Sequence, residues 1–192
     1  MTAMRRYGRS EIEDFLKQVD AHLRRPADVI VIGWAAAMLR YDAPGRTIDI
    51  DTWSDVAGLQ TAVAEATEAT GLSIPFGSAG VADAPYDFES RLERAMPRLK
   101  RLRIQVPEKH DLALMKAVRG LEHDFEALAT LHRQSPLDSD LLARRFRDEM
   151  GHAMGDPARL RGNFLALVER LFPDRVDAVA AELRKRKRLP RP

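Results

Sequence analysis

Two short segments near the start of the chain constrain the fold more than any other part of it. Residues 29–32 are all apolar and are followed by Gly33, which is typical of a buried strand that ends in a tight turn. Residues 48–53 begin with alternating apolar and acidic side chains. Because residues two apart on a strand share a face, Asp49 and Asp51 are predicted to present two carboxylates side by side, with the apolar side chains pointing into a core.

The paired carboxylates indicate a site for a divalent cation. Like charges at this spacing repel unless a cation lies between them, and Mg²⁺ prefers oxygen ligands together with waters and substrate phosphates. Gly33 lets the backbone approach a phosphate closely, and a helix that starts there offers free N–H donors. These features predict phosphoryl or nucleotidyl transfer. The alternative is an edge strand whose acidic face is exposed to solvent.

The composition predicts a globular protein with a substantial core. Of the 192 residues, 45% are hydrophobic and 31% are charged, which fits one ordinary domain or two small ones. The net charge of +2 does not by itself indicate nucleic-acid binding. The absence of cysteine excludes disulfides, zinc–thiolate sites and thiol nucleophiles. Because there is no signal-peptide pattern and no run of about 18 apolar residues, we expect a cytoplasmic protein.

The order of the elements predicts an α+β fold in two parts. Residues 1–107 are expected to form a small mixed β-sheet flanked by helices, and residues 108–192 a helical domain. Ser10 and Glu13 have the capping-box spacing for a first helix, which residues 24–26 end. The expected strands are residues 28–32, 48–53, 77–82 and 102–106. The further expected helices are residues 35–39, 54–71 with Ser54 as N-cap, 86–96, 111–119, 122–132, 139–150, 157–171 and 173–187.

A second group of polar residues follows the last expected strand. Lys116 and Arg119 are three residues apart and share one face of a predicted helix, and His123 and Asp124 come shortly after. A lysine aimed at a triphosphate offsets charge on the transferring oxygens, and His123 is a candidate base near neutral pH. The alternative is structural, with a solvated Lys116 and an Asp124 stabilised by a helix dipole.

Together the two groups resemble the minimal nucleotidyltransferases, in particular the group around the AbiEii-type toxins and related bacterial proteins. The resemblance covers residues 28–130 approximately. It rests on Gly33 after a strand, the run Arg46-Thr47-Ile48-Asp49-Ile50-Asp51, the segment from Asp111-Leu112 to Lys116, and Asp124.

The resemblance implies a nucleotidyltransferase core that the helical domain completes. It assigns Asp49 and Asp51 to a two-metal site for Mg²⁺, or alternatively Mn²⁺, with Asp83 as the third carboxylate. The same two aspartates are catalytic, and Lys116 and Asp124 complete the active site. The residues assigned to the nucleotide are Gly33, Trp34, Arg46, Thr47, Lys116 and Arg119.

The implied reaction moves a nucleoside monophosphate from an NTP, such as ATP, to an acceptor hydroxyl on tRNA or a protein. The chain would then be the toxin of a toxin–antitoxin pair, with a cognate antitoxin as a partner. Two departures from the family pattern favour an alternative, a catalytically weakened nucleotide- or RNA-binding module of the same fold. Trp34 stands where the family has a small residue, and Ala127 where it often has an acid. A kinase is disfavoured because the chain has no Walker or protein-kinase motif.

Six basic residues lie within the last ten positions, 183–192. Such a tail can contact nucleic-acid phosphates with salt-sensitive affinity, or it can be a solvated helix end favoured by the helix dipole. The segment has no aromatic residue for stacking on bases, so we expect no base-specific recognition by it.

Overall fold

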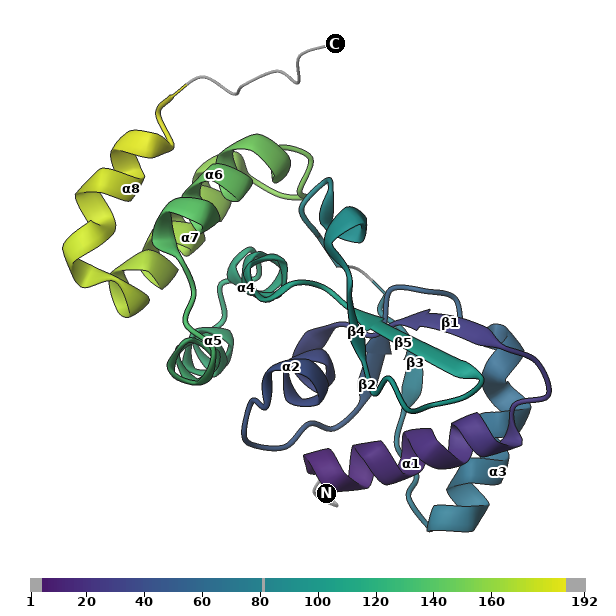
Figure 1. The fold of residues 1–192 in the computed structure, drawn as a ribbon. Helices are drawn as coiled ribbons and strands as arrows, with labels where there is room; N and C mark the ends of the chain where they lie inside the picture. The colour runs from purple at the N-terminus through teal and green to yellow at the C-terminus, as the bar shows by residue number, and fades with distance from the viewer. Residues whose placement is uncertain (1–4, 81, 186–192) are drawn as a thin grey trace. The chain divides into compact units, whose positions relative to one another are not determined.

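The computed structural model describes residues 5–80 and 82–185, which form two compact units with an α+β fold (Figure 1). The first unit draws on Met1–Val81 and Leu92–Pro107, and the second on Ala82–Arg91 and Glu108–Pro192. No helix in the described ranges is long and apolar enough to cross a membrane. Most of the predicted basic tail, residues 186–192, lies outside the described residues.

The first unit contains a mixed three-stranded β-sheet, as the sequence predicts, and a second sheet of two strands. The strands of the unit are β1 (Ala27–Ile30), β2 (Ile50–Thr52), β3 (Phe76–Ser78), β4 (Glu93–Ala95) and β5 (Leu102–Val106). β5 lies between β1, to which it is parallel, and β4, to which it is antiparallel, while β2 pairs in parallel with β3. An antiparallel bridge between Val31 and Thr52 joins the two sheets just beyond β1.

Three α-helices pack in this unit, α1 (Arg9–His22), α2 (Gly33–Tyr41) and α3 (Gln60–Thr70), with α1 in contact with both of the others. The N-cap of α1 is Gly8 rather than the predicted Ser10. The Glu11 carboxylate accepts a 2.8 Å hydrogen bond from the Gly8 amide, which supplies the reciprocal half of a capping box. The apolar stripe of α1 is fully buried and consists of Ile12, Phe15, Leu16 and Val19.

Ser54 does not cap α3, which corrects a second prediction. Its hydroxyl instead accepts a 2.9 Å hydrogen bond from the Ile30 amide at the end of β1. A short 3₁₀ helix, η1 (Ala57–Leu59), precedes α3, so that the α-helix begins at Gln60. The next strand, predicted at 77–82, is only three residues long and starts one residue earlier.

The helix predicted at 86–96 is wrong. The segment forms a 3₁₀ turn, η2 (Phe88–Arg91), and then β4. The cause is long-range pairing, because Glu93 and Ala95 are in register with Val106 and Ile104 of β5. The strand prediction for 102–106 is confirmed, since its burial alternates along β5.

The second unit is helical. Its helices are α4 (Lys109–Ala117), α5 (Glu122–Gln134), α6 (Ser139–Glu149), α7 (Pro157–Leu171), η3 (Pro173–Arg175) and α8 (Val176–Glu182). Asp138 and Asp156 cap α6 and α7 by accepting hydrogen bonds from first-turn amides. Phe146 and Phe164 stack at 4.3 Å between ring centroids and join these two helices in the core.

Candidate active site

Gly33 and Asp51 lie together just beyond the end of β1. The Ile32 amide donates a 2.9 Å hydrogen bond to the Asp51 carbonyl, which brings β2 against the start of α2. Gly33 has φ of +68°, a left-handed conformation that favours glycine. A β-carbon at this position would lie 3.4 Å from Oδ2 of Asp51. The carboxylate is therefore beside the N-terminus of α2, where backbone N–H groups have no partner within the helix.

Asp49 directly precedes β2, and Asp51 is the middle residue of that strand. Both are half-buried, whereas Ile50 between them is fully buried, as the alternation predicts. The Thr47 hydroxyl donates to Oδ1 of Asp49 over 3.3 Å. The backbone of Thr47 pairs with that of Tyr7 through two hydrogen bonds of 2.7 and 3.0 Å. The segment leading to the two carboxylates is thus held in place by the residues before α1.

Arg46 and Trp34, both predicted to contact the nucleotide, contact the protein itself. The Arg46 guanidinium donates to the Arg6 carbonyl over 3.0 and 2.6 Å and to the Glu11 carboxylate over 2.8 Å. Trp34 is half-buried, and its Nε1 lies 3.5 Å from the point that a β-carbon of Gly45 would occupy. Both side chains therefore shape the loop between α2 and β2.

Lys116, Arg119 and Asp124 come together in the second unit. Nζ of Lys116 and Nη2 of Arg119 donate to the same Oδ1 of Asp124, over 2.9 and 2.7 Å. Asp124 is fully buried, and within the described ranges its Oδ2 has no hydrogen-bond partner. The side chain of Lys116 is 12% exposed and that of Arg119 is 53% exposed. His123 lies farther away, at 3.9 Å from the same oxygen.

The turn between α4 and α5 sets the spacing of this cluster. Gly120 has φ of +69° in the turn. Asn163 of α7 donates to the Val118 carbonyl over 3.1 Å, which ties the turn to the core of the unit. Because Lys116 precedes the turn and Asp124 follows it, the turn brings the cation and the carboxylate into contact.

Asp83, the predicted third carboxylate, belongs to the second unit, whereas Asp49 and Asp51 belong to the first. Its Oδ1 accepts a 3.1 Å hydrogen bond from the Met154 amide. Over residues 5–80 and 82–185, no group of three or more histidine, aspartate or glutamate side chains is arranged to hold a metal ion. The role of Asp83 stays a prediction.

Residues 10–166 match a protein family described as nucleotidyltransferase of unknown function (DUF6036). The chain belongs to this family. The matched region includes all the residues assigned above to the candidate site, so the nucleotidyltransferase resemblance seen in the sequence is confirmed at this level. Searches of curated proteins and of solved structures found no match. The narrower resemblance to the toxin group stays a prediction.

The donor set of this nucleotidyltransferase fits Mg²⁺. Asp49 and Asp51 supply two half-buried carboxylates from positions two residues apart in one segment. Mg²⁺ is commonly bound through only one or two carboxylates, with waters and substrate phosphates filling its other positions. Two carboxylates are thus a donor set of the kind that Mg²⁺ accepts.

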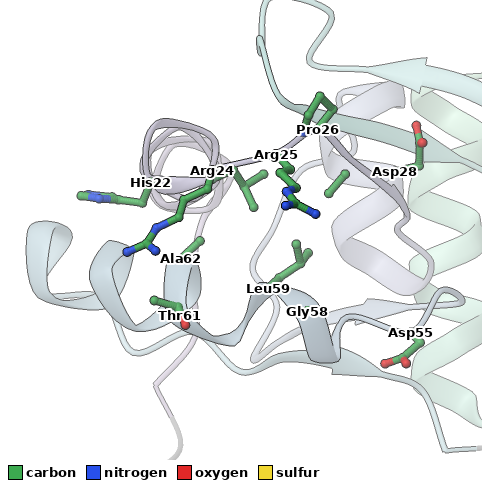
Figure 2. Close-up of a pocket in the computed structure, with 12 residues that line it drawn as sticks. His22, Arg24, Arg25, Pro26, Asp28, Asp55, Gly58, Leu59, Thr61 and Ala62 are labelled. Atoms are coloured by element: carbon green, nitrogen blue, oxygen red, sulfur yellow. The ribbon is translucent and has the colours of Figure 1, made fainter.

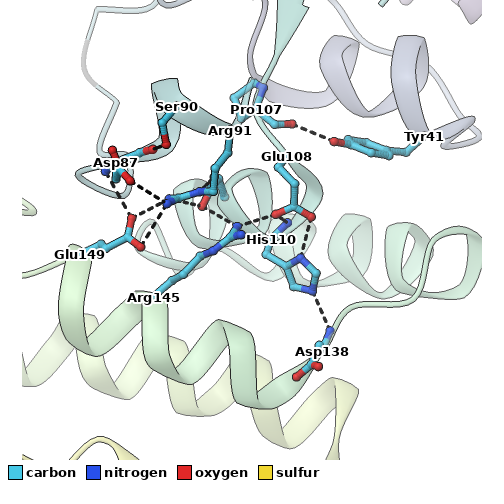
Figure 3. Close-up of polar contacts among 11 residues, drawn as sticks. Tyr41, Asp87, Ser90, Arg91, Pro107, Glu108, His110, Asp138, Arg145 and Glu149 are labelled. Carbon is cyan, nitrogen blue, oxygen red and sulfur yellow. Dashed lines mark hydrogen bonds and ion pairs between the residues drawn. The ribbon is translucent and has the colours of Figure 1, made fainter. Parts of the chain in front are cut away.

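An ion network that the sequence did not predict surrounds the N-terminus of α4 (Figure 3). Arg91 donates to Asp111 over 2.9 and 3.1 Å and to Glu149 over 2.6 Å. Arg145 also donates to Asp111, over 2.9 Å, and to Glu108. Asp111 is fully buried, so its charge is matched by two arginines. The network joins η2, α4 and α6 within the second unit.

His110 extends this network toward the start of α6. Its Nε2 accepts a 2.8 Å hydrogen bond from the Asp138 amide, and its Nδ1 lies 2.7 Å from the Glu108 carboxylate. Since an amide can only donate, Nε2 carries no proton, and Nδ1 is the nitrogen that donates to Glu108. Burial raises the pKa of Glu108, but the hydrogen bonds from His110 and Arg145, together with the positive charge of Arg145, outweigh it and lower the pKa to about 2.

Proposed function

We propose that the chain is a Mg²⁺-dependent nucleotidyltransferase that moves a nucleoside monophosphate from an NTP to an acceptor hydroxyl. The observation that supports this most strongly is the pairing of Gly33 with the Asp51 carboxylate at the N-terminus of α2. The site combines an anion-binding helix terminus with ligands for a hard cation, and both are needed to hold a triphosphate. Membership of the family supports the same reaction class.

Each cluster has a role in this proposal. The α2 terminus at Gly33 holds a phosphate group, and Asp49 and Asp51 hold Mg²⁺, with Asp83 as the proposed further ligand. When bound, the metal would neutralise triphosphate charge and lower the pKa of the attacking hydroxyl. Lys116 offsets negative charge on the transferring phosphoryl oxygens.

Two residues of the second unit support Lys116. The buried carboxylate of Asp124 fixes the position of the ammonium group, because it accepts a hydrogen bond from Nζ. Arg119 shares the same oxygen but is half exposed, so it is the residue placed to reach a nucleotide from solvent.

The acceptor is proposed to be tRNA or a protein side chain, and the biological role that of a toxin with a cognate antitoxin. The support for both is the resemblance of the motif to the AbiEii-type group. We expect ATP among the donors, with Mn²⁺ able to replace Mg²⁺.

Transfer of label from each of the four α-labelled NTPs tests the reaction. With Mg²⁺, bulk RNA and a protein mixture, label should reach RNA or protein in the wild type and fall at least 100-fold in the Asp49→Ala, Asp51→Ala double variant. Asp14→Ala is the matched control, because Asp14 is an exposed residue of α1 whose carboxylate pairs with Lys17. Equal transfer by the wild type and the double variant would refute the proposal.

A second candidate function is a weakened module that binds a nucleotide or RNA without catalysis. The observation that favours it is Trp34, whose bulky indole follows Gly33 at the start of α2 and lies against the neighbouring loop. Ala127, which stands where the family often has an acid, points the same way. The dependence of nucleotide binding on Mg²⁺ separates this function from the enzyme.

A further inference from the structure

A concentrated positive charge lies on the first unit, away from Gly33. The loop between α1 and β1 contributes Arg24 and Arg25, and the loop between β4 and β5 contributes Arg98, Lys100 and Arg101. All five side chains are exposed, and neither loop contains an acidic residue. We call these five residues the basic surface.

The two loops are neighbours because β1 and β5 are parallel. Ala27 is in register with Leu102, and its amide donates a 2.9 Å hydrogen bond to the Arg101 carbonyl. The carboxylate of Asp20, on α1, accepts hydrogen bonds of 3.1, 2.6 and 2.7 Å from the amides of Lys100, Arg101 and Leu102. Burial raises the pKa of Asp20, but these bonds outweigh it and lower the pKa. The cations of the second loop therefore project from a backbone that α1 holds in place.

Most of the charge of the basic surface is not neutralised by the protein, although the Asp20 carboxylate attracts Arg101 electrostatically. Within residues 5–80 and 82–185, none of its five side chains forms an ion pair. By contrast, Arg103 of β5 is neutralised by Asp28 through two hydrogen bonds of 2.6 Å. Unpaired cations grouped on one surface create a field that attracts an anionic partner.

Arg24 and Arg25 also line a groove of about 570 Å³ between the end of α1, the start of β1 and the start of α3. Figure 2 shows the Arg25 side chain pointing into this groove. Both acidic side chains of its lining have partners, since Asp28 binds Arg103 and Asp55 accepts a 2.9 Å hydrogen bond from a backbone amide. A backbone hydrogen bond leaves the charge of Asp55 in place, but Arg24 and Arg25 outnumber this one carboxylate, so the groove lining keeps a net positive charge.

We propose that the basic surface binds the phosphate backbone of RNA. This inference rests on the proposed function, because the RNA would be its acceptor. Guanidinium groups bind phosphates through paired hydrogen bonds, and such contacts account for most sequence-independent affinity. The large apolar side chains that the described part of the chain exposes are Trp53, Tyr86, Leu121 and Met154, and none lies in either loop. The apolar anchors typical of protein partners and membrane surfaces are thus missing here.

The position of the basic surface sets a minimum length for a productive RNA. From Ala27 to Gly33 the chain advances six residues, which is about 20 Å when extended. A stacked strand that rises about 3.4 Å per nucleotide covers this distance in about six nucleotides. Stacked oligonucleotides well below this length do not span the distance from the basic surface to the Gly33 end of β1, so we expect them to be poor acceptors.

The salt dependence of RNA binding tests the inference. Fluorescence anisotropy of a labelled single strand about twice this minimum length, with the full chain, gives the slope of log affinity against log salt. Each phosphate contact contributes about 0.7 to the slope for a single strand. The Arg24→Gln, Arg25→Gln double variant, and likewise Lys100→Gln with Arg101→Gln, should each reduce the slope by about 1.4. The matched control is Arg144→Gln with Arg159→Gln, two exposed arginines of the second unit, which should leave the slope unchanged.

The outcomes separate this inference from the proposed function. The Asp49→Ala, Asp51→Ala double variant should bind RNA at least as tightly as the wild type, because it keeps the basic surface and loses two negative charges that repel phosphates. Salt-sensitive binding without label transfer supports the inference and refutes the proposed function. Label transfer to protein without RNA binding at low salt refutes the inference alone. An equal reduction of the salt slope in the control variant would also refute it. So would tighter binding to phosphatidylserine vesicles or to an acidic protein than to RNA.

Discussion

At the scale of single residues, Gly120 is a position where any side chain would destabilise the fold. A β-carbon there would lie 2.3 Å from the Asn163 side chain, and φ is +69°. Gly120→Ala therefore forces alanine into the left-handed region and displaces Asn163 from its hydrogen bond to Val118. We expect the free energy of unfolding, measured in urea, to fall by about 2–3 kcal/mol.

Gly162→Ala is the matched control for this substitution. Gly162 lies within α7 and is exposed, and apart from the adjoining backbone of its own helix and its two chain neighbours nothing lies within 4 Å of its hypothetical β-carbon. Alanine is the better helix former, so the same substitution should here raise the free energy of unfolding by about 0.5–1 kcal/mol. Effects of the same sign at the two glycines would contradict the account of the α4–α5 turn.

At the scale of elements, α4 connects the ion network at its N-terminus to Lys116 near its C-terminus. The pKa of Glu108, about 2, is below its ordinary value of 4.5, so its stabilising effect is complete above pH 4.5 and is lost as the pH falls toward 2. Glu108→Gln removes the charge that binds Arg145. We expect the variant to be less stable than the wild type by about 2 kcal/mol at pH 7, and the difference to close between pH 4.5 and 2.

Urea unfolding at a series of pH values checks this prediction. Glu126→Gln is the control, because Glu126 is exposed on α5 and should change stability little at any pH. If the two proteins differ in free energy of unfolding by the same amount from pH 7 to pH 2, the charge of Glu108 does not stabilise the fold, and the prediction is wrong.

The elements that could be predicted are those whose local signals agree with their long-range partners. β5 alternates in hydrophobicity and is buried on one face, and α7 begins at Pro157, where its sequence places the start. The segment 86–96 has helical spacing, but Arg91 binds carboxylates 20 and 58 residues away, and β4 pairs with β5. Contacts between residues so far apart in the sequence cannot be predicted from the local spacing of apolar residues.

In the candidate site, too, local spacing predicted some features, whereas contacts between distant residues set others. Spacing alone predicted that Asp49 and Asp51 flank a buried isoleucine, and that Lys116 and Arg119 share a face. It did not predict that Arg46 binds Glu11, 35 residues earlier. Nor did it predict that Lys116 and Arg119 both donate to the buried Asp124. The first kind of result follows from strand and helix periodicity, whereas the second depends on which elements the fold brings together.

At the scale of the whole molecule, the residues of the proposed site are divided between the two units. Gly33, Asp49 and Asp51 belong to the first, and Lys116 and Asp124 to the second. A nucleotide that engages these residues must stabilise the folded chain, because a ligand bound only to the folded state lowers its free energy by RT ln(1 + [L]/Kd). At a ligand concentration about 100 times Kd this amounts to about 2.7 kcal/mol, enough to raise the melting temperature by several degrees.

The dependence of that shift on metal decides between the two candidate functions. For the enzyme, each productive NTP should raise the melting temperature only with Mg²⁺ present, and Asp49→Ala with Asp51→Ala should abolish the shift, because the carboxylates bind the nucleotide through the metal. For the weakened module, the shift should persist in EDTA and in the double variant, since the α2 terminus and Lys116 bind phosphates directly. The Asp14→Ala control should keep the wild-type shift in both cases. Four NTPs that leave the melting temperature unchanged, with or without Mg²⁺, would contradict both functions.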